Sequence, residues 1–352
     1  MAQESSFLRR RWKLILNIVT IAALILFAYA IREDLGDTIK NFERVNGWLL
    51  VLLLPIQILN YHAQTKMYQG MFSIVGNNLS YKFLFKASLE LNFVNHVFPS
   101  GGAAGISYFG LRLKNGEITG AKATLIQVMK LALTFLAFEL ILIFGMLCLA
   151  AVGKANNLTI LVGTAISTLL LVGTFGFAYV VGSKARINHF FTGVTRVLNR
   201  LIQVVRPKHP ETINISSARH VFNDFHDNYR LLQKSLPQLK APFWYAFLAN
   251  LTEILSIYVV FLAFGQTVNF GAVVLAYGVA NFAGLVSVLP GGVGVYEFLM
   301  TAVLATAGVS ASVSIPVIIM YRVVNTLIQV PPGYILYQKN LNASQKATAR
   351  GA

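Results

Sequence analysis

Leu289-Pro290-Gly291-Gly292-Val293-Gly294-Val295-Tyr296-Glu297 interrupts an apolar run that extends from residue 271 to residue 313. The proline and the three glycines leave backbone groups without helical partners, and each such group costs several kcal/mol in hydrocarbon. A break of this kind is tolerated only where it is buried in protein or lines a wet cavity. A second break, Phe98-Pro99-Ser100-Gly101-Gly102-Ala103-Ala104-Gly105, occurs in the first half of the chain. Two such breaks in corresponding places of two halves are typical of a transporter-like site.

The composition indicates an integral membrane protein. Of the 352 residues, 56% are hydrophobic and only 12% are charged, against roughly 25% charged residues in soluble proteins. The net charge of +16 resides in segments between apolar runs, which favours contact with anionic lipid over nucleic acid. The single cysteine excludes an intramolecular disulfide. The sequence has no metal-binding, dinucleotide-binding or ATP-binding motif, so we expect no cofactor and no enzymatic activity.

Hydropathy predicts an all-α protein with six full membrane spans and two re-entrant helical hairpins. Pro55 predicts a kink in the second span. Hairpin A comprises residues 81–98 and 103–113, and its second part is too short to cross a bilayer. Hairpin B comprises residues 271–289 and 295–309; two full spans there would give the same topology. The six predicted spans are residues 14–31, 48–64, 124–152, 158–181, 243–264 and 315–337.

Positive charge predicts the orientation of the chain in the membrane. Most of the 29 Lys and Arg residues fall in segments that this topology places in the cytoplasm, together with both termini. Residues 183–240 form a basic linker with two amphipathic helical patterns, which we expect to lie on anionic lipid in a prokaryotic inner membrane. The alternative is a pair of solvated linker helices.

The two halves of the chain, residues 13–152 and 158–338, match element by element within a single membrane domain. Each half has two spans, a broken hairpin and one further span, and the second half starts on the opposite side of the membrane. Lys130 and Arg322 lie at nearly the same distance after the prolines of their respective breaks, and a threonine follows each four positions later. The sequence therefore predicts two halves of inverted topology.

The residues around both breaks resemble a known family. The stretch from Pro290 to Glu297, the pair Tyr321-Arg322 and Pro331-Pro332-Gly333-Tyr334 are similar to the transmembrane region of lysylphosphatidylglycerol synthases, a family of flippase-like membrane proteins. Asn95-His96-Val97-Phe98-Pro99 and Arg112 resemble its other marked region, and the likeness extends over about residues 13–338. Full-length synthases carry a large cytoplasmic aminoacyl-transferase domain, for which this chain has no segment of sufficient length. The resemblance therefore implies lipid translocation and not the synthase activity.

Six ionisable residues fall within predicted membrane segments, where each charge costs roughly 2.5–3.5 kcal/mol and requires a partner or water. Glu297 follows the break, and two roles are open for it. It either pairs with Arg322 and gates a cavity, or binds a proton that couples transport to a gradient. A buried pair that only fixes packing is the structural alternative. The six residues are Glu90, Lys130, Glu139, Glu253, Glu297 and Arg322.

Cationic side chains near the bilayer centre suit a phosphate group. Arg322 and Lys130 come from corresponding spans and Arg112 follows hairpin A, so we expect them to attract an anionic phospholipid or a polyprenyl phosphate. Lys130 has the alternative of reaching the water interface along its apolar stem. Asn95 and Asn281 either contact the headgroup or satisfy broken backbone, and His96 is expected to be a packing residue.

The leading hypothesis is translocation of such a lipid through a midplane cavity between the hairpins. The alternative is a membrane accessory subunit, with a lipid-modifying or glycosyl-transferring enzyme as partner. Assembly into a homo-oligomer is compatible with either hypothesis.

Overall fold

The computed structural model describes residues 45–98, 103–114, 118–190, 192–193, 229–230, 234–286 and 294–350. Within these ranges the chain forms α-helices, turns and one short 3-10 helix, η2 (Leu236–Leu239), and it contains no strand. The predicted first span, both Pro-Gly breaks from Pro99 to Gly102 and from Pro290 to Gly292, and most of the 183–240 linker lie outside the described residues.

Among the described residues, four helices are long and apolar enough to cross a membrane, and they confirm four of the predicted spans as apolar helices. They are α7 (Gly120–Ala151), α8 (Asn157–Val181), α11 (Lys240–Ala263) and α14 (Ala311–Arg350). Side-chain caps fix two of their starts: Thr119 Oγ1 accepts from the Lys122 N–H, and Asn156 Oδ1 accepts from the Thr159 N–H at 2.9 Å. Such caps satisfy backbone donors that have no partner inside the helix.

The second predicted span differs from its expected bounds. The chain forms α3 (Gly47–Val51) and α4 (Leu53–Ile74), with an interruption at Leu52. Pro55 has no N–H to donate to the carbonyl of residue 51, which accounts for the interruption. The predicted end at Gln64 is wrong, because α4 continues to Ile74 despite several polar residues. Met67, Tyr68, Met71 and Phe72 are fully buried against neighbouring helices, and this packing holds the last three turns.

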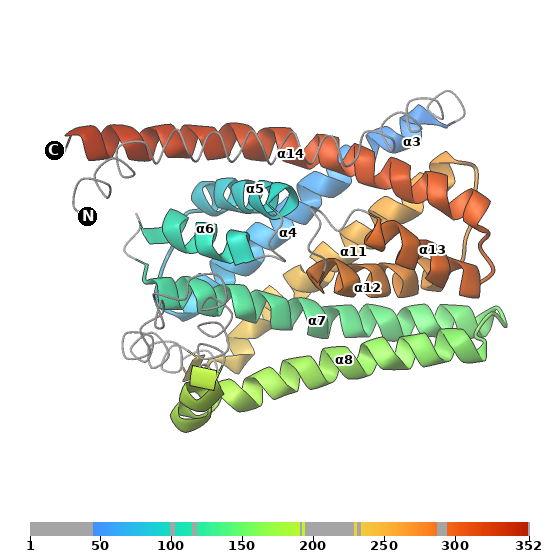
Figure 1. Cartoon of the computed structure of the whole chain (residues 1–352), viewed down its shortest axis with the longest axis horizontal. Helices are drawn as coiled ribbons and strands as arrows, with labels where there is room; N and C mark the ends of the chain where they lie inside the picture. The colour runs from blue at the N-terminus through green and yellow to red at the C-terminus, as the bar shows by residue number, and fades with distance from the viewer. Residues whose placement is uncertain are drawn as a thin grey trace, which may run out of the picture.

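The two predicted hairpins consist of shorter helices. Hairpin A is formed by α5 (Tyr81–Val97) and α6 (Ala103–Lys114), and hairpin B by α12 (Phe270–Val286) and α13 (Val295–Thr306). Each of these four helices is shorter than the ~20 residues needed to cross a bilayer. Figure 1 places hairpin A in one half of the molecule's length and hairpin B in the other half.

The last helix of each predicted half packs against the hairpin of the other half. Helix α14 runs beside α5, and α7 runs beside α12 (Figure 1). Glycines permit both close approaches: a Cβ on Gly333 would lie 2.6 Å from the Leu89 carbonyl oxygen, and a Cβ on Gly145 would lie 2.9 Å from Val274 Cβ. Helix α4 pairs with α11, and the two cross the molecule diagonally between these layers.

Helices α7 and α8 present an apolar outer surface. Leu147, Leu161 and Phe175 are each more than 60% exposed. Large aliphatic and aromatic side chains with this exposure are suited to contact with lipid acyl chains. These two helices therefore lie at the rim of the bundle.

Candidate functional site

Glu297 links the start of α13 to α14. Gly294 adopts a φ of +84° at the N-cap of α13, a conformation that favours glycine. The Gly294 N–H donates to Glu297 Oε2 at 2.7 Å, and Arg322 Nη1 donates to Glu297 Oε1. Both carboxylate oxygens thus accept hydrogen bonds, which favours the pairing role of Glu297 over the proton-carrying role.

Arg322 on α14 is held beside the start of α13 in hairpin B. Its guanidinium carbon lies 5.2 Å from the centroid of the Tyr296 ring, in cation–π geometry. His96 bonds through Nδ1 to the Asn92 carbonyl at 2.9 Å. The side chains of Arg322 and Glu297 are 18% and 15% exposed, so this ion pair, which we call the Arg322 junction, is not sealed.

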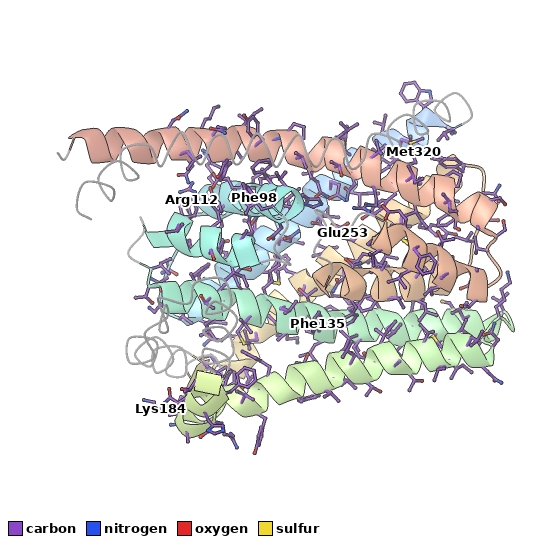
Figure 2. All side chains as sticks on the ribbon, in the orientation of Figure 1. Phe98, Arg112, Phe135, Lys184, Glu253 and Met320 are labelled. Atoms are coloured by element: carbon purple, nitrogen blue, oxygen red, sulfur yellow. The ribbon has the colours of Figure 1, made fainter. Side chains whose placement is uncertain are left out.

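Polar side chains from five helices form a hydrogen-bonded cluster, which we call the polar core. Figure 2 labels Glu253 near the middle of the molecule. The polar core consists of Gln57, Asn60 and Gln64 on α4, Asn92 on α5, Lys130 on α7, Thr252, Glu253 and Ser256 on α11, and Tyr321, Asn325 and Gln329 on α14.

Lys130 belongs to the first branch of the polar core. Its Nζ donates to Gln64 Oε1 at 2.9 Å and lies 5.1 Å from the centroid of the Tyr68 ring. Gln64 Nε2 then donates to Asn60 Oδ1 at 2.6 Å. Asn60 Nδ2 donates across to α11, at 2.9 Å to both Thr252 Oγ1 and the Ala249 carbonyl. The Lys130 side chain is therefore directed into the bundle and not to the water interface.

Glu253 belongs to the second branch. It accepts a hydrogen bond from the Tyr321 hydroxyl at 2.9 Å. Asn325 Nδ2 lies 3.4 Å from the same hydroxyl, and Gln329 Nε2 donates to Asn325 Oδ1 at 2.8 Å and to Gln57 Oε1 at 3.0 Å. Gln57, Asn60 and Gln329 are each at most 3% exposed. Buried polar groups of this kind are expensive unless they are hydrogen-bonded, so the cluster fixes how α4, α11 and α14 cross.

Glu90 and Arg112 form a separate ion pair inside hairpin A. Arg112 Nε donates to Glu90 Oε2 at 2.7 Å, and the Tyr108 hydroxyl donates to the same oxygen at 2.7 Å. The guanidinium also stacks over the Phe83 ring, 4.6 Å from its centroid. Figure 2 labels Arg112 toward the far end of α6 from the Arg322 junction. The structure thus pairs Arg112 with Glu90 and does not bring it to Lys130.

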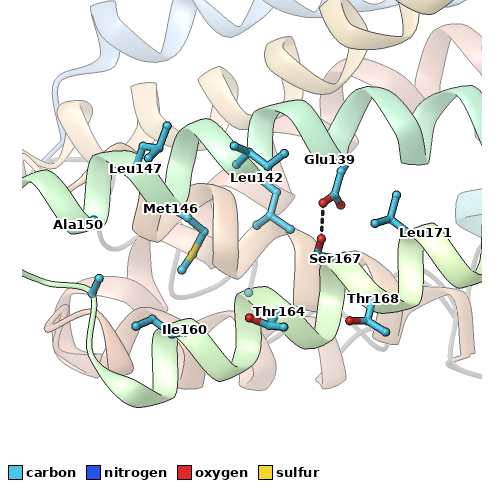
Figure 3. Close-up of a pocket in the computed structure, with 13 residues that line it drawn as sticks. Glu139, Leu142, Met146, Leu147, Ala150, Ile160, Thr164, Ser167, Thr168 and Leu171 are labelled. Carbon is cyan, nitrogen blue, oxygen red and sulfur yellow. Dashed lines mark hydrogen bonds between the residues drawn. The ribbon is translucent and has the colours of Figure 1, made fainter.

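The other predicted residues lie away from the junction or make local contacts. Glu139 faces α8, where its Oε1 accepts from the Ser167 hydroxyl (Figure 3). Asn281 Nδ2 donates to the Tyr277 carbonyl of its own helix at 2.8 Å. Asn95 lies against Gly105, so it supports the packing of α5 on α6. Among the described residues, no three His, Cys, Asp or Glu side chains gather closely enough to hold a metal ion.

Glu253 and Lys130 were predicted as site residues, whereas the amides of Gln57, Asn60, Gln64, Asn325 and Gln329 in the same cluster were not. A signal for them exists in the sequence. Gln57, Asn60 and Gln64 fall at helical spacing along one face of α4, and Tyr321, Asn325 and Gln329 repeat every four residues along α14. A stripe of amides along an apolar helix indicates a buried polar contact with another helix.

Long apolar helices, shorter apolar helices and a buried polar cluster define an integral, multi-pass, all-helical membrane protein. Residues 14–333 match the family described as the lysylphosphatidylglycerol synthase TM region, and the chain belongs to this family. It is 23% identical over 317 residues to a UPF0104 membrane protein of Methanothermobacter thermautotrophicus, covering 89% of this chain and 90% of the relative. It is 20% identical over 337 residues to a UPF0104 membrane protein of Pyrococcus horikoshii, covering 94% and 97%.

Proposed function

We propose that this protein moves an anionic lipid, either a phospholipid or a polyprenyl phosphate, across the cytoplasmic membrane of a prokaryote without changing it chemically. The observation that carries the proposal is Arg322, which pairs with Glu297 of hairpin B and remains partly exposed. A partly exposed cation beside the first turn of a short hairpin helix is suited to a phosphate that must leave one membrane surface for the other.

The proposed role of Arg322 is to bind the phosphate through its planar fork of N–H donors. Glu297 holds the guanidinium in place and competes with the phosphate for it, so the ion pair closes the site when no headgroup is present. The polar core supplies further hydrogen bonds around Glu253 and Lys130. The hydrocarbon chains of the lipid remain in the bilayer, which avoids the cost of enclosing them.

Inverted topology of residues 13–152 and 158–338 provides the proposed route to alternating access. The reciprocal packing of α14 on α5 and of α7 on α12 supports this division, because a two-fold relation would exchange these contacts. Small relative movements of the two hairpins would then open the junction to one surface at a time. In this proposal both termini and the basic linker 183–240 face the cytoplasm.

The test measures movement of labelled phosphatidylglycerol and phosphatidylcholine in proteoliposomes. We expect movement of the anionic lipid to fall at least about tenfold in Arg322→Gln, since a charge-assisted hydrogen bond contributes about 1.5–3 kcal/mol. Arg322→Lys should retain part of the rate, because it keeps the charge and loses the fork. Lys154→Gln, which removes an exposed cation between α7 and α8, is the matched control and should behave as wild type.

Glu297→Gln should also slow translocation, because it removes the charge that orients Arg322. A labelled polyprenyl phosphate is assayed in the same way, and if folded wild-type protein moves none of the three lipids above the rate of protein-free vesicles, transport by the chain alone is refuted. The accessory-subunit alternative would then be favoured, and the 183–240 linker would be the segment to test for binding of a partner enzyme.

A further inference from the structure

A cavity between α7 and α8 lies apart from the junction and the polar core. It holds about 460 Å³ open to water-sized molecules, and most of its wall is aliphatic (Figure 3). Leu147, Ile143 and Ile160 line it and are also among the large exposed apolar side chains of the rim helices. The cavity is therefore accessible from the lipid side of the bundle.

One polar group in this wall has an unmet hydrogen-bonding requirement. Glu139 is only 8% exposed, and Ser167 occupies its Oε1, but its Oε2 is buried and has no hydrogen-bond partner among the described residues. Leaving such a group without a partner costs about 1–3 kcal/mol, and more when it is charged. At 100° per residue, the nine residues from Lys130 to Glu139 turn the two side chains to opposite faces of α7. Glu139 therefore does not serve the polar core.

The depth of Glu139 restricts what can approach it. The twelve residues from Glu139 to Ala151 rise about 18 Å along α7, which is close to half of a ~30 Å hydrocarbon core. In the bilayer beside the rim helices, away from the proposed transport site, a phospholipid headgroup remains at the membrane surface, and a phosphate would be repelled by the carboxylate. The lining residues include no Lys or Arg that could neutralise Glu139.

We propose that this cavity binds a neutral lipid alcohol dissolved in the bilayer, a long-chain or isoprenoid alcohol whose hydroxyl bonds to Glu139 Oε2. A hydroxyl can donate to a carboxylate oxygen or accept from a carboxylic acid, so it suits either protonation state of Glu139. The hydroxyls of Thr164 and Thr168 lie along the same wall, beside Ser167. The aliphatic wall accommodates the chain of the alcohol. This chain takes the place of the lipid acyl chains that otherwise contact the wall, so the exchange costs little free energy.

The experiment labels the full chain in lipid nanodiscs with a diazirine-bearing hexadecanol and, in parallel, with the matching hydrocarbon that lacks the hydroxyl. Mass spectrometry then locates the adducts. We expect the alcohol to label α7 and α8 around the cavity about fivefold more than the hydrocarbon does, the ratio that one hydrogen bond of about 1 kcal/mol provides. Glu139→Leu should remove this preference.

Two further variants keep the test decisive if Glu139→Leu does not fold. Thr164→Trp fills the cavity and should abolish the labelling, whereas Ala165→Trp places the same ring on the exposed surface of α8 outside the cavity and should not. Arg322→Gln should leave the labelling unchanged, which separates this site from the proposed transport site. Equal labelling by alcohol and hydrocarbon in wild type, or full labelling in Thr164→Trp, would overturn the proposal.

Discussion

Gly333→Ala tests the close packing of α14 on hairpin A. The added Cβ would lie 2.6 Å from both the Leu89 carbonyl oxygen and Phe93 Cβ. Neither atom is at the end of a flexible side chain, so α5 as a whole must shift. Overpacking of this kind costs about 1–3 kcal/mol or more, while the replacement of a helical glycine by alanine returns up to about 1 kcal/mol. We therefore expect a net destabilisation of about 2 kcal/mol, a factor of about 30 in the folding equilibrium.

The measurement is thermal unfolding of purified protein in one detergent at a fixed scan rate, because unfolding of a membrane protein is often irreversible. Gly173→Ala is the matched control: Gly173 lies within α8, and an added Cβ there meets no atom within 4 Å. This control should melt at or slightly above the wild-type temperature. If Gly333→Ala is as stable as Gly173→Ala, then the glycine of the Pro-Pro-Gly sequence is not required for the approach of α14 to α5, and our reading of that contact is wrong.

The same melting assay checks three further predictions. Arg112→Met should destabilise the protein by about 3 kcal/mol, because it leaves the Glu90 carboxylate buried without its cation, and the double variant Glu90→Gln/Arg112→Met should be less affected. Asn60→Leu removes three side-chain hydrogen bonds at roughly 0.6 kcal/mol each, so it should destabilise the protein by about 2 kcal/mol. The control Asn281→Leu removes a hydrogen bond within its own helix, and its stability should stay near that of wild type. Ser167→Ala should destabilise the protein by about 1–3 kcal/mol, because it removes the hydroxyl that donates to Glu139, whereas Ser167→Thr keeps a hydroxyl and should be as stable as wild type. Equal stability of the two variants would contradict the role of this hydrogen bond.

Backbone chemistry made much of the helical layout predictable. The predicted starts of the helices after the two breaks, residues 103 and 295, are the first residues of α6 and α13, whereas α13 ends at Thr306 and not at the predicted residue 309. Four long apolar runs identified four helices by length alone. The end of α4 was missed, because Gln64, Lys66 and Gln69 resemble the polar end of a span. Only the packing of Met67 and Phe72 against other helices shows why the helix continues.

The sequence identified several residues of the candidate site, but it did not predict which of them contact one another. Pairing with Arg322 was one of the two roles open for Glu297, and this contact is present. By contrast, Arg112 was grouped with Lys130, whereas its contacts are with Glu90 and Tyr108 in the same hairpin. Long charged side chains reach partners on any neighbouring helix, so sequence spacing alone does not select among them.

The sequence by itself therefore determined that this is a helical membrane protein, where its helices break, and which charges require partners, because hydrocarbon penalises every unpaired backbone group and charge. The tertiary structure decided which partners those groups obtain. Asn60 bonds to Thr252, Gln329 to Gln57, and Glu139 to Ser167, and two of these three bonds join residues more than 190 positions apart. Local propensity carries no information on such distances, because the crossing of α4, α11 and α14 is fixed only when their side chains pack together.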